Sequence, residues 1–171
     1  LLDLTARTTS FVHVTGYHDD WVMLSGRNRP ERAYAALATA NYFDVMGVKA
    51  VLGRPFLSSE DDTLGGSPVV VIGYGLWQSR FAGSQTVIGK TLEVNSRPYT
   101  IIGVTPRDFR GCKTGLRTDL WIPVVMDREV WGSDRPVRRG TSWLNVIGRL
   151  RTDLTREQAQ DDTNRVMQGI A

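Results

Sequence analysis

Between Asn41 and Pro123 the sequence alternates short apolar runs with glycine and proline breaks. This punctuation limits the chain to short, closely packed strands and helices. Four clusters follow one another, at residues 41–48, 53–62, 68–81 and 88–104. None of them holds a nucleophile motif, a set of metal ligands or a phosphate-binding loop. The function must therefore be inferred from the architecture that these clusters build.

The apolar runs predict a sheet of mixed type. Val69–Ile72 is a β-branched run typical of a buried strand, and Thr91–Val94 with Tyr99–Val104 indicates a hairpin. Further strands are expected at residues 32–39, 119–123 and 143–150, and at 11–14 and 21–24, which form a hairpin bounded by Gly16 and Asp19-Asp20. The alanines of residues 32–39 argue against a strand there, because alanine favours helix.

Helices are expected at three places besides the helix start at the acidic residues 60–62. Asn41 is a suitable N-cap for a short helix over residues 42–46, and Gly83 ends a second helix that begins at Tyr74. A Thr155–Gln158 capping box starts a third helix, which runs to residue 169. Residues 127–141 are expected to form a loop. The mixed order of strands and helices predicts an α+β fold, in which helices pack on a mixed sheet.

Size and charge exclude several classes of protein. The chain has 171 residues with 41% hydrophobic and 23% charged residues, which suits one folded domain or two small lobes. Its net charge of +3 is too small to predict a nucleic-acid partner. The densest basic run, between Arg135 and Arg139, lacks aromatic neighbours and is best interpreted as a solvated loop. Binding of nucleic acid or of anionic lipid head groups are the alternatives for this run.

No stretch reaches the roughly 18 apolar residues that cross a bilayer. The chain starts at Leu1, with neither an initiating methionine nor a leader peptide. We expect it to be a fragment whose membrane anchors lie outside it.

Cys112 is the only cysteine, so an intramolecular disulfide is excluded. Arg110 and Lys113 stand close to it in the sequence, and their charge would lower the pKa of the thiol. An activated thiol is therefore one hypothesis. An incidental loop cysteine is the simpler one.

Three other patterns have both a chemical and a structural interpretation. Gly73–Gly75 follows a strand and opens a helix, as in a dinucleotide-binding turn, but Gln78 replaces the third glycine. A structural turn is the better interpretation, although Glu93 stands near the distance expected for a ribose ligand. His13 and His18 with Asp19 and Asp20 suggest either a metal site or a strand with turn residues.

The acids Glu60, Asp61 and Asp62 either bind Ca²⁺ or begin a helix. The spacing of a calcium loop is missing, so a helix start is favoured.

The five tryptophans have two kinds of role. Trp77 and Trp121 lie inside apolar runs and are expected in the core. Trp131 and Trp143 flank the irregular segment and are candidates for an exposed contact surface. Trp21 is assigned to neither the core nor this surface. Such a surface suits a sugar or a hydrophobic drug.

Taken together, the clusters resemble the MacB-like periplasmic core domain of MacB/FtsX-type ABC transporter permeases. The resemblance covers roughly residues 10–151. It is carried by Ala40–Val48, Leu52–Phe56, Val69–Trp77, Arg80-Phe81, Val87–Lys90, Tyr99–Pro106 and Asp119–Pro123.

The resemblance implies a non-catalytic, extracytoplasmic domain between two transmembrane helices of a bacterial inner-membrane protein. It implies a mixed lobe with packed helices and a smaller, β-rich inserted lobe, here about residues 50–140. It implies no catalytic residue, metal or cofactor, because a separate cytoplasmic ATPase hydrolyses ATP. The implied partners are the protein's own transmembrane helices and that ATPase. An envelope protein and a second copy of the protein, in a homodimer, are further candidates.

In such a domain, motion of the transmembrane helices passes to a substrate or partner. Gly47, Gly53 and Gly65-Gly66 are candidate hinges. Two rival hypotheses remain: a module that binds a ligand or peptide, and a hydrolase that uses Cys112 or an acid pair.

Overall fold

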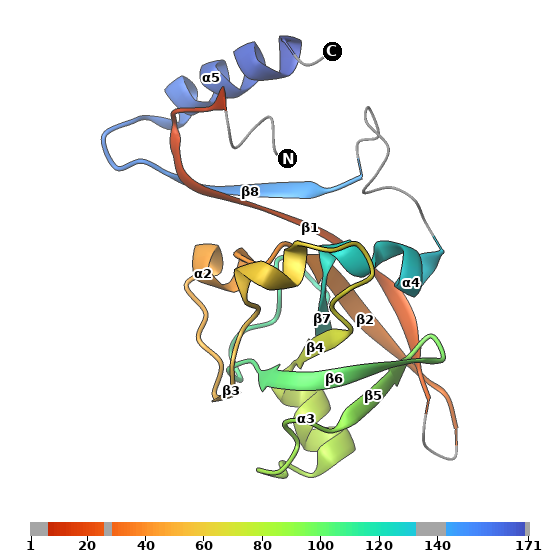
Figure 1. Ribbon diagram of the computed structural model, residues 1–171. Coiled ribbons are helices and arrows are strands. Elements are labelled where there is room, and N and C mark those ends of the chain that lie inside the picture. The colour runs from red at the N-terminus through yellow and green to blue at the C-terminus, as the bar shows by residue number, and fades with distance from the viewer. Residues whose placement is uncertain (1–6, 26–28, 133–142, 170–171) are drawn as a thin grey trace.

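The computed structural model describes residues 7–25, 29–132 and 143–169. The strands are β1 Phe11–Leu24, β2 Glu31–Ala38, β3 Leu52–Gly53, β4 Val69–Ile72, β5 Thr91–Val94, β6 Arg97–Val104, β7 Leu120–Pro123 and β8 Asn145–Leu150. The helices are α2 Tyr42–Met46, α3 Tyr74–Phe81, α4 Asp127–Trp131 and α5 Arg156–Gln168, with 3₁₀ turns η1 Ser58–Asp61 and η2 Val124–Met126. The predicted α+β class with a mixed sheet is confirmed (Figure 1).

β1 is one strand of 14 residues, so the hairpin expected at residues 11–24 is wrong. Gly16 continues the strand instead of forming a turn. The parts of β1 before and after this point pair with different strands. Residues 11–17 pair with β8, and residues 17–24 pair with β2. Asp20 also stays in the strand, where its carboxylate accepts a hydrogen bond from the Trp21 amide at 2.7 Å.

Among the described strands, β1 also closes the sheet into a ring. It pairs with β2 on one side and with β5 on the other, and the ring continues through β6, β4 and β7 back to β2. The β1–β5 contact is short, since Leu24 opposite Val94 is its one paired position. β8 lies outside the ring on the first half of β1, and β3 pairs with β6. We call the ring, with β3, α2, α3 and α4, the barrel unit.

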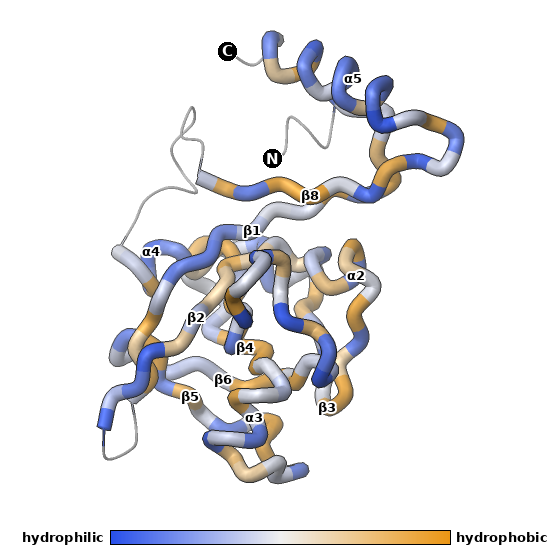
Figure 2. The backbone as a smooth tube through the Cα atoms, turned by 180° about the vertical axis from the view of Figure 1, so that it is seen from behind, coloured by the Kyte–Doolittle hydropathy of each residue, from blue (hydrophilic) through white to orange (hydrophobic). Residues whose placement is uncertain are grey.

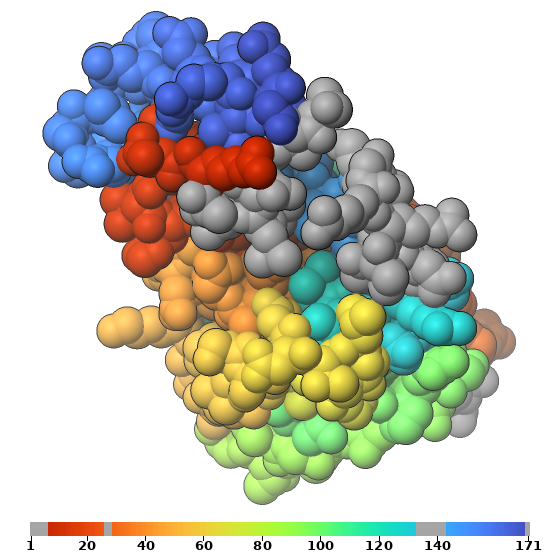
Figure 3. All heavy atoms as spheres, turned by 45° about the horizontal axis from the view of Figure 1, so that its top comes forward, coloured from red at the N-terminus to blue at the C-terminus, as the bar shows by residue number. Residues whose placement is uncertain are grey.

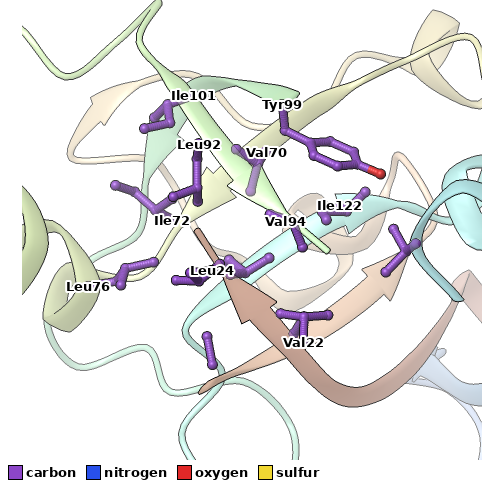
Figure 4. Packing of buried hydrophobic residues seen from close by; sticks show 14 of the residues in the cluster. Val22, Leu24, Val70, Ile72, Leu76, Leu92, Val94, Tyr99, Ile101 and Ile122 are labelled. Carbon is purple, nitrogen blue, oxygen red and sulfur yellow. The ribbon is translucent and has the colours of Figure 1, made fainter. Parts of the chain in front are cut away.

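Apolar side chains fill the inside of the ring (Figure 4). This core comes from all six strands of the ring and includes Val22, Leu24, Leu37, Val70, Ile72, Leu92, Val94, Tyr99, Ile101, Leu120 and Ile122. Leu76 and Trp77 join it from α3, and Val130 joins it from α4. Burial of this many large apolar side chains is the main source of the barrel's stability.

A second core covers the outer face of β2, β7 and β4. Tyr42 and Phe43 of α2 pack there against Trp121, and the Phe109 ring stacks on Trp121 with centroids 5.3 Å apart. β2 lies between the two cores, so its alanines are buried on both faces. The strand expected at residues 32–39 is confirmed, because burial on both faces overrides the helical preference of alanine.

β8, α5 and residues 7–14 form a second group at one end of the molecule, which we call the terminal unit (Figure 3). α5 is mostly hydrophilic, and it turns only a narrow face with Ala159 and Val166 inward (Figure 2). The Thr155 capping box is confirmed: the Gln158 amide donates to Thr155 Oγ1, and the Thr155 amide donates to Gln158 Oε1.

Several expected boundaries can be compared with the structure. The prediction of a loop over residues 127–141 is wrong for its first residues, because Asp127–Trp131 forms the helix α4. Residues 133–142 lie outside the described residues. The inserted lobe at about residues 50–140 remains a prediction. The strands of that range share one sheet with β1 and β2. In the part of the chain described, no helix is long and apolar enough to cross a bilayer.

Candidate functional site

The candidate site is the junction between the terminal unit and the barrel unit, where β1 changes partner. Buried Thr15 and Thr39 face each other there, with their hydroxyl oxygens 2.8 Å apart. The Gly16 amide donates to the Thr39 hydroxyl at 3.2 Å, and the Thr39 amide donates to the Gly16 carbonyl at 3.0 Å. The Thr39 hydroxyl donates its one proton to Asn41 Oδ1, so Thr15 must be the donor between the two threonines.

Asn41 connects the turn before α2 to β1. Its Nδ2 donates to the Val14 carbonyl at 2.9 Å, while its Oδ1 accepts from Thr39. Asn41 stands at the predicted N-cap position of α2, and its carbonyl accepts a hydrogen bond from the Val45 amide at 3.0 Å, but its side chain makes no capping hydrogen bond. The strand carbonyl takes its amide instead, and this bond fixes the turn against the middle of β1.

Asp61 holds the same turn from the other side. Its Oδ2 accepts a hydrogen bond from the Ala40 amide at 2.5 Å, and its buried Oδ1 has no partner among the described residues. Burial raises the pKa of the Asp61 carboxyl, and the nearby charges of Asp62 and Glu60 raise it further. The Ala40 amide opposes this rise without cancelling it. The ionised Asp61 carboxylate therefore destabilises the folded state at neutral pH.

We expect Asp61→Asn to stabilise the protein at neutral pH. The raised pKa in the folded state means that this group favours folding below its ordinary pKa of about 3.9, and that the benefit is lost at higher pH. An amide cannot ionise and keeps an acceptor for the Ala40 amide. Thermal unfolding should show a rise of about 2–4 °C in Tm at pH 7. At pH 3 the two proteins should unfold together, and an equal gain at both pH values would contradict the explanation.

Arg149 makes the second bridge between the units. Its Nη2 on β8 donates to the Val45 carbonyl near the end of α2 at 2.6 Å. Gly47 ends α2 in a left-handed conformation with φ of 69°, which a residue with a side chain adopts only at a cost. A cation at the C-terminal end of a helix also satisfies a free carbonyl. The hinge role suggested for Gly47 remains a prediction, as do those for Gly53 and Gly65-Gly66.

Asp162 fixes α5 to the start of β1. Its Oδ2 accepts hydrogen bonds from the Thr9 amide at 2.9 Å, the Ser10 amide at 3.1 Å and the Ser10 hydroxyl at 2.8 Å, while Arg165 pairs with Oδ1. These bonds, with the Ser10 hydroxyl and Arg165 foremost, lower the pKa of the Asp162 carboxyl. The side chain is only 8% exposed, so the terminal unit is held by a shielded, charge-assisted contact.

The residues first considered as a metal site do not gather in one place. His18 lies between Trp131 and Trp143, with ring centroids 5.5 and 5.7 Å away. Asp19 instead accepts a hydrogen bond from the Tyr34 hydroxyl at 2.7 Å, and His13 lies exposed in the terminal part of β1. Within the described ranges, no three His, Cys, Asp or Glu side chains are placed to hold a metal ion.

The hypothesis of an activated Cys112 thiol is corrected by its surroundings. Burial raises the pKa of Cys112, and the hydrogen bond with Tyr42 only partly opposes the rise. The Lys113 ammonium donates to the Tyr34 hydroxyl at 2.8 Å and lies 3.8 Å from Asp19, so its charge is engaged elsewhere. The thiol is therefore protonated at neutral pH.

The acidic and glycine motifs both have structural roles. Glu60 lies in the 3₁₀ turn η1, so the expected helix start is a single tight turn, and its carboxylate forms an ion pair with Arg54, which precedes the turn, at 2.8 Å. A Cβ at Gly73 would lie 3.1 Å from the Asp119 carbonyl oxygen, and one at Gly75 would lie 2.8 Å from Arg117. Both glycines therefore allow close packing of the β4–α3 turn on the segment before β7.

The tryptophans divide broadly as predicted. Trp77 and Trp121 are core residues, whereas Trp131 and Trp143 are half-buried and both contact His18. Trp21 is exposed, and the Arg32 guanidinium lies over its ring at 4.5 Å. The basic run from Arg135 to Arg139 lies outside the described residues.

No sequence pattern pointed to the junction residues Thr15, Thr39 and Arg149. Each is an ordinary strand or turn residue when taken alone, and its partner lies many positions away. A buried threonine in the middle of a long strand is the one signal available, because a buried hydroxyl needs a partner.

Comparison with known proteins agrees with this architecture. The family model for the MacB-like periplasmic core domain matches residues 2–166. Curated relatives include the macrolide export ATP-binding/permease protein MacB of Neisseria gonorrhoeae, 38% identical over 82 residues, or 48% of this chain and 12% of that protein. The MacB protein of Aggregatibacter actinomycetemcomitans is 35% identical over 94 residues, or 54% of this chain and 14% of that protein. The matched segments are thus a small part of these relatives.

Solved structures share the fold at low identity. The periplasmic region of MacB from Actinobacillus actinomycetemcomitans has a TM-score of 0.72 at 19% identity, covering 96% of this chain and 69% of that one. The extracellular domain of the ABC-type transporter YknZ from Gram-positive bacteria has a TM-score of 0.70 at 16% identity, covering 99% and 84%. By its family match, which extends over nearly its whole length, this chain belongs to the MacB-like periplasmic core domains, the periplasmic domains of MacB-like ABC-type transporter permeases.

Proposed function

We propose that this domain transmits movement between the transmembrane helices of an ABC-type permease and the periplasm, and that it catalyses no reaction itself. The observation that carries the proposal is β1. Its first half belongs to the terminal unit and its second half belongs to the barrel unit, with no break between them. A continuous strand whose two halves are each paired with a neighbouring strand resists bending, so displacement of the terminal unit carries the barrel unit with it.

The junction supports this role. Thr15, Thr39 and Asn41 fix the barrel unit to the middle of β1, and the bond from Arg149 to α2 resists rotation about the strand. Buried polar networks of this kind specify one geometry, because any other arrangement leaves donors or acceptors unpaired. The two units are therefore held in one relative orientation.

The proposal also names partners. The chain's own transmembrane helices would drive the terminal unit, and a cytoplasmic ATPase subunit or domain would supply the energy. The curated relatives are named as macrolide exporters, so a macrolide is the first substrate to test. An envelope protein and a second copy of the permease are further candidate partners.

Spin labels test the rigid connection in the full-length permease. We would label position 160 on α5 and position 100 on β6, both exposed, and measure their separation with and without bound nucleotide. The proposal expects one narrow distance that does not change between the two states. A change of more than about 5 Å would mean that the units bend about the junction, and coupling through β1 would be rejected.

Thr39→Val tests the contribution of the junction itself. The substitution keeps the shape of the side chain but leaves the Gly16 amide and the Thr15 hydroxyl without their acceptor. We expect a loss of about 1–3 kcal/mol in the free energy of unfolding, a broader label distance and weaker transport for the same rate of ATP hydrolysis. Thr91→Val changes an exposed threonine on β5 that carries no label, and it should alter none of these quantities. Unchanged transport in a Thr39 variant that is measurably destabilised would contradict the role of the junction.

A further inference from the structure

The barrel wall has an opening on one side, next to the end of α3. β1 pairs with β5 at a single position, Leu24 opposite Val94, and just beyond it the Ser25 amide donates to the Glu93 carbonyl at 3.1 Å. Among the described residues, the first half of β5 therefore has no strand beside it on that side. The C-terminal end of α3 faces this part of β5 (Figure 1). Between them is a cavity of about 380 Å³, lined by Ser25, residues 80–81 and residues 90–93.

A buried guanidinium lines this cavity. The Arg80 side chain is 6% exposed; within the described ranges its Nη1 donates to Glu31 Oε2 at 3.2 Å and its Nη2 donates to the Ser25 carbonyl. A guanidinium carries five N–H donors, so three of them have no partner in the part of the chain that the structure describes. Arginine is rarely buried to this extent unless its charge is paired. The donors that the fold leaves free are therefore available to an anion.

The ion pair with Glu31 gives Arg80 a structural role, but a weak one. The Glu31 side chain is 52% exposed, and an ion pair with an exposed partner contributes little because water screens it. A carboxylate that enters the cavity can replace Glu31 on the guanidinium, since Glu31 then returns to water at little cost. The bond to the Ser25 carbonyl uses the other terminal nitrogen and can remain in place.

The rest of the lining indicates which kind of anion fits. Arg80 and the exposed Lys90 bring two positive charges to the cavity, against the one negative charge of Glu93. Phe81 and Leu92 supply an apolar wall, because Leu92 belongs to the barrel core and Phe81 packs against it. The planar fork of arginine binds a carboxylate through two parallel hydrogen bonds. The lining thus fits a small molecule with a carboxylate at one end and an apolar group at the other.

We propose that this cavity binds a small organic carboxylate, whose charged end lies on the Arg80 guanidinium and whose apolar group lies against Phe81 and Leu92. Its volume of about 380 Å³ is within the roughly 300–1,000 Å³ of ordinary small-molecule sites. Inorganic phosphate satisfies the guanidinium but leaves the apolar wall in water, so we expect it to bind more weakly. The cavity lies beyond the end of β1, apart from the junction at its middle, and binding there does not depend on the proposed transmission of movement.

Titration of the full 171-residue chain with phenylacetate, followed through the backbone amide chemical shifts, tests the site. We expect saturable shifts at millimolar concentration, centred on residues 80–81 and 90–93. Phenylacetamide has the same shape without the charge and should bind about tenfold more weakly. Shifts spread over the whole surface would reject the proposal, as would equal binding of phenylacetamide or of inorganic phosphate.

Glu31→Gln decides whether Arg80 receives the ligand. The substitution removes the competing carboxylate from the guanidinium and should tighten phenylacetate binding about threefold. Arg80→Lys keeps the charge but loses the fork, and it should weaken binding about tenfold, with thermal unfolding as the check of its fold. If Glu31→Gln binds no more tightly than the unaltered chain, the guanidinium serves the fold alone and the proposal is rejected.

The two other charges of the lining give changes of opposite sign. Lys90→Gln should weaken phenylacetate binding about threefold, and Glu93→Gln should strengthen it by a similar factor. Lys49→Gln is the matched control, because Lys49 is equally exposed but does not line the cavity, and its affinity should stay as it is. Equal effects of Lys90→Gln and Lys49→Gln would show attraction by the net charge of the protein instead of binding in this cavity, and would contradict the proposal.

Discussion

Gly103→Ala is expected to cause the largest loss of stability of any substitution considered for this domain, about 3 kcal/mol or more in the free energy of unfolding. Gly103 lies in β6, directly opposite Gly53 of β3. A Cβ atom at Gly103 would lie 2.1 Å from the carbonyl oxygen of Arg54. The three nearest atoms all belong to the Arg54 backbone, so no side-chain movement can relieve the contact and β3 must separate from β6.

Chemical denaturation of the purified chain measures this effect. Gly169→Ala provides the control, because a Cβ atom there would meet nothing closer than 3.6 Å and the backbone is already helical. That variant should unfold within about 0.5 kcal/mol of the unaltered protein. Similar small changes in both variants would show that β3 moves aside easily, and the close contact between the two strands would then have no energetic weight.

What could be predicted from the sequence was local. The strand Val69–Ile72, the helix Tyr74–Phe81 and the Thr155 capping box are set by neighbouring residues, and all three are confirmed. The Asn95-Ser96 turn likewise follows from a local preference. Both residues have positive φ, as a tight two-residue hairpin turn requires.

What could not be predicted depended on distant partners. Gly16 was interpreted as a turn because nothing near it shows that β1 exchanges β8 for β2 at that point. Asn41 does stand at the N-cap of α2, but its side chain bonds to the carbonyl of Val14, 27 positions away, instead of capping the helix. The closure of the ring also rests on a short contact between β1 and β5. The junction between the units is therefore the part of the site that only the fold reveals.

The same distance between partners explains why the expected lowering of the pKa of the Cys112 thiol is wrong. The pKa of the Cys112 thiol was expected to follow its basic neighbours in sequence, but burial beside Tyr42 and the engagement of Lys113 by Tyr34 decide it. The clusters that resemble a known family gave the correct class of protein because they specify packing. They do not specify which polar side chains meet.

Asp162→Asn is expected to loosen α5 from the start of β1 and to speed exchange of the α5 backbone amides about tenfold. An amide side chain lacks the charge that strengthens the bonds from Thr9 and Ser10, and it loses the pairing with Arg165. The lowered pKa of Asp162 fixes the pH dependence. Its contribution is present above the ordinary aspartate pKa of about 3.9 and is lost as the pH falls further through the lowered value.

Hydrogen exchange followed by mass spectrometry of peptides measures this effect for each element. At pH 7 the peptides from α5 should exchange faster in the variant, whereas those from β4 and β6 should be unchanged, because the barrel core does not depend on this contact. Asp153→Asn is the matched control, since Asp153 forms an exposed ion pair with Arg151, and such pairs contribute little. Equal exchange of α5 in the variant and the unaltered chain would mean that the apolar face of the helix alone holds it. Movement of α5 would then be transmitted to β1 more weakly than the proposed function requires.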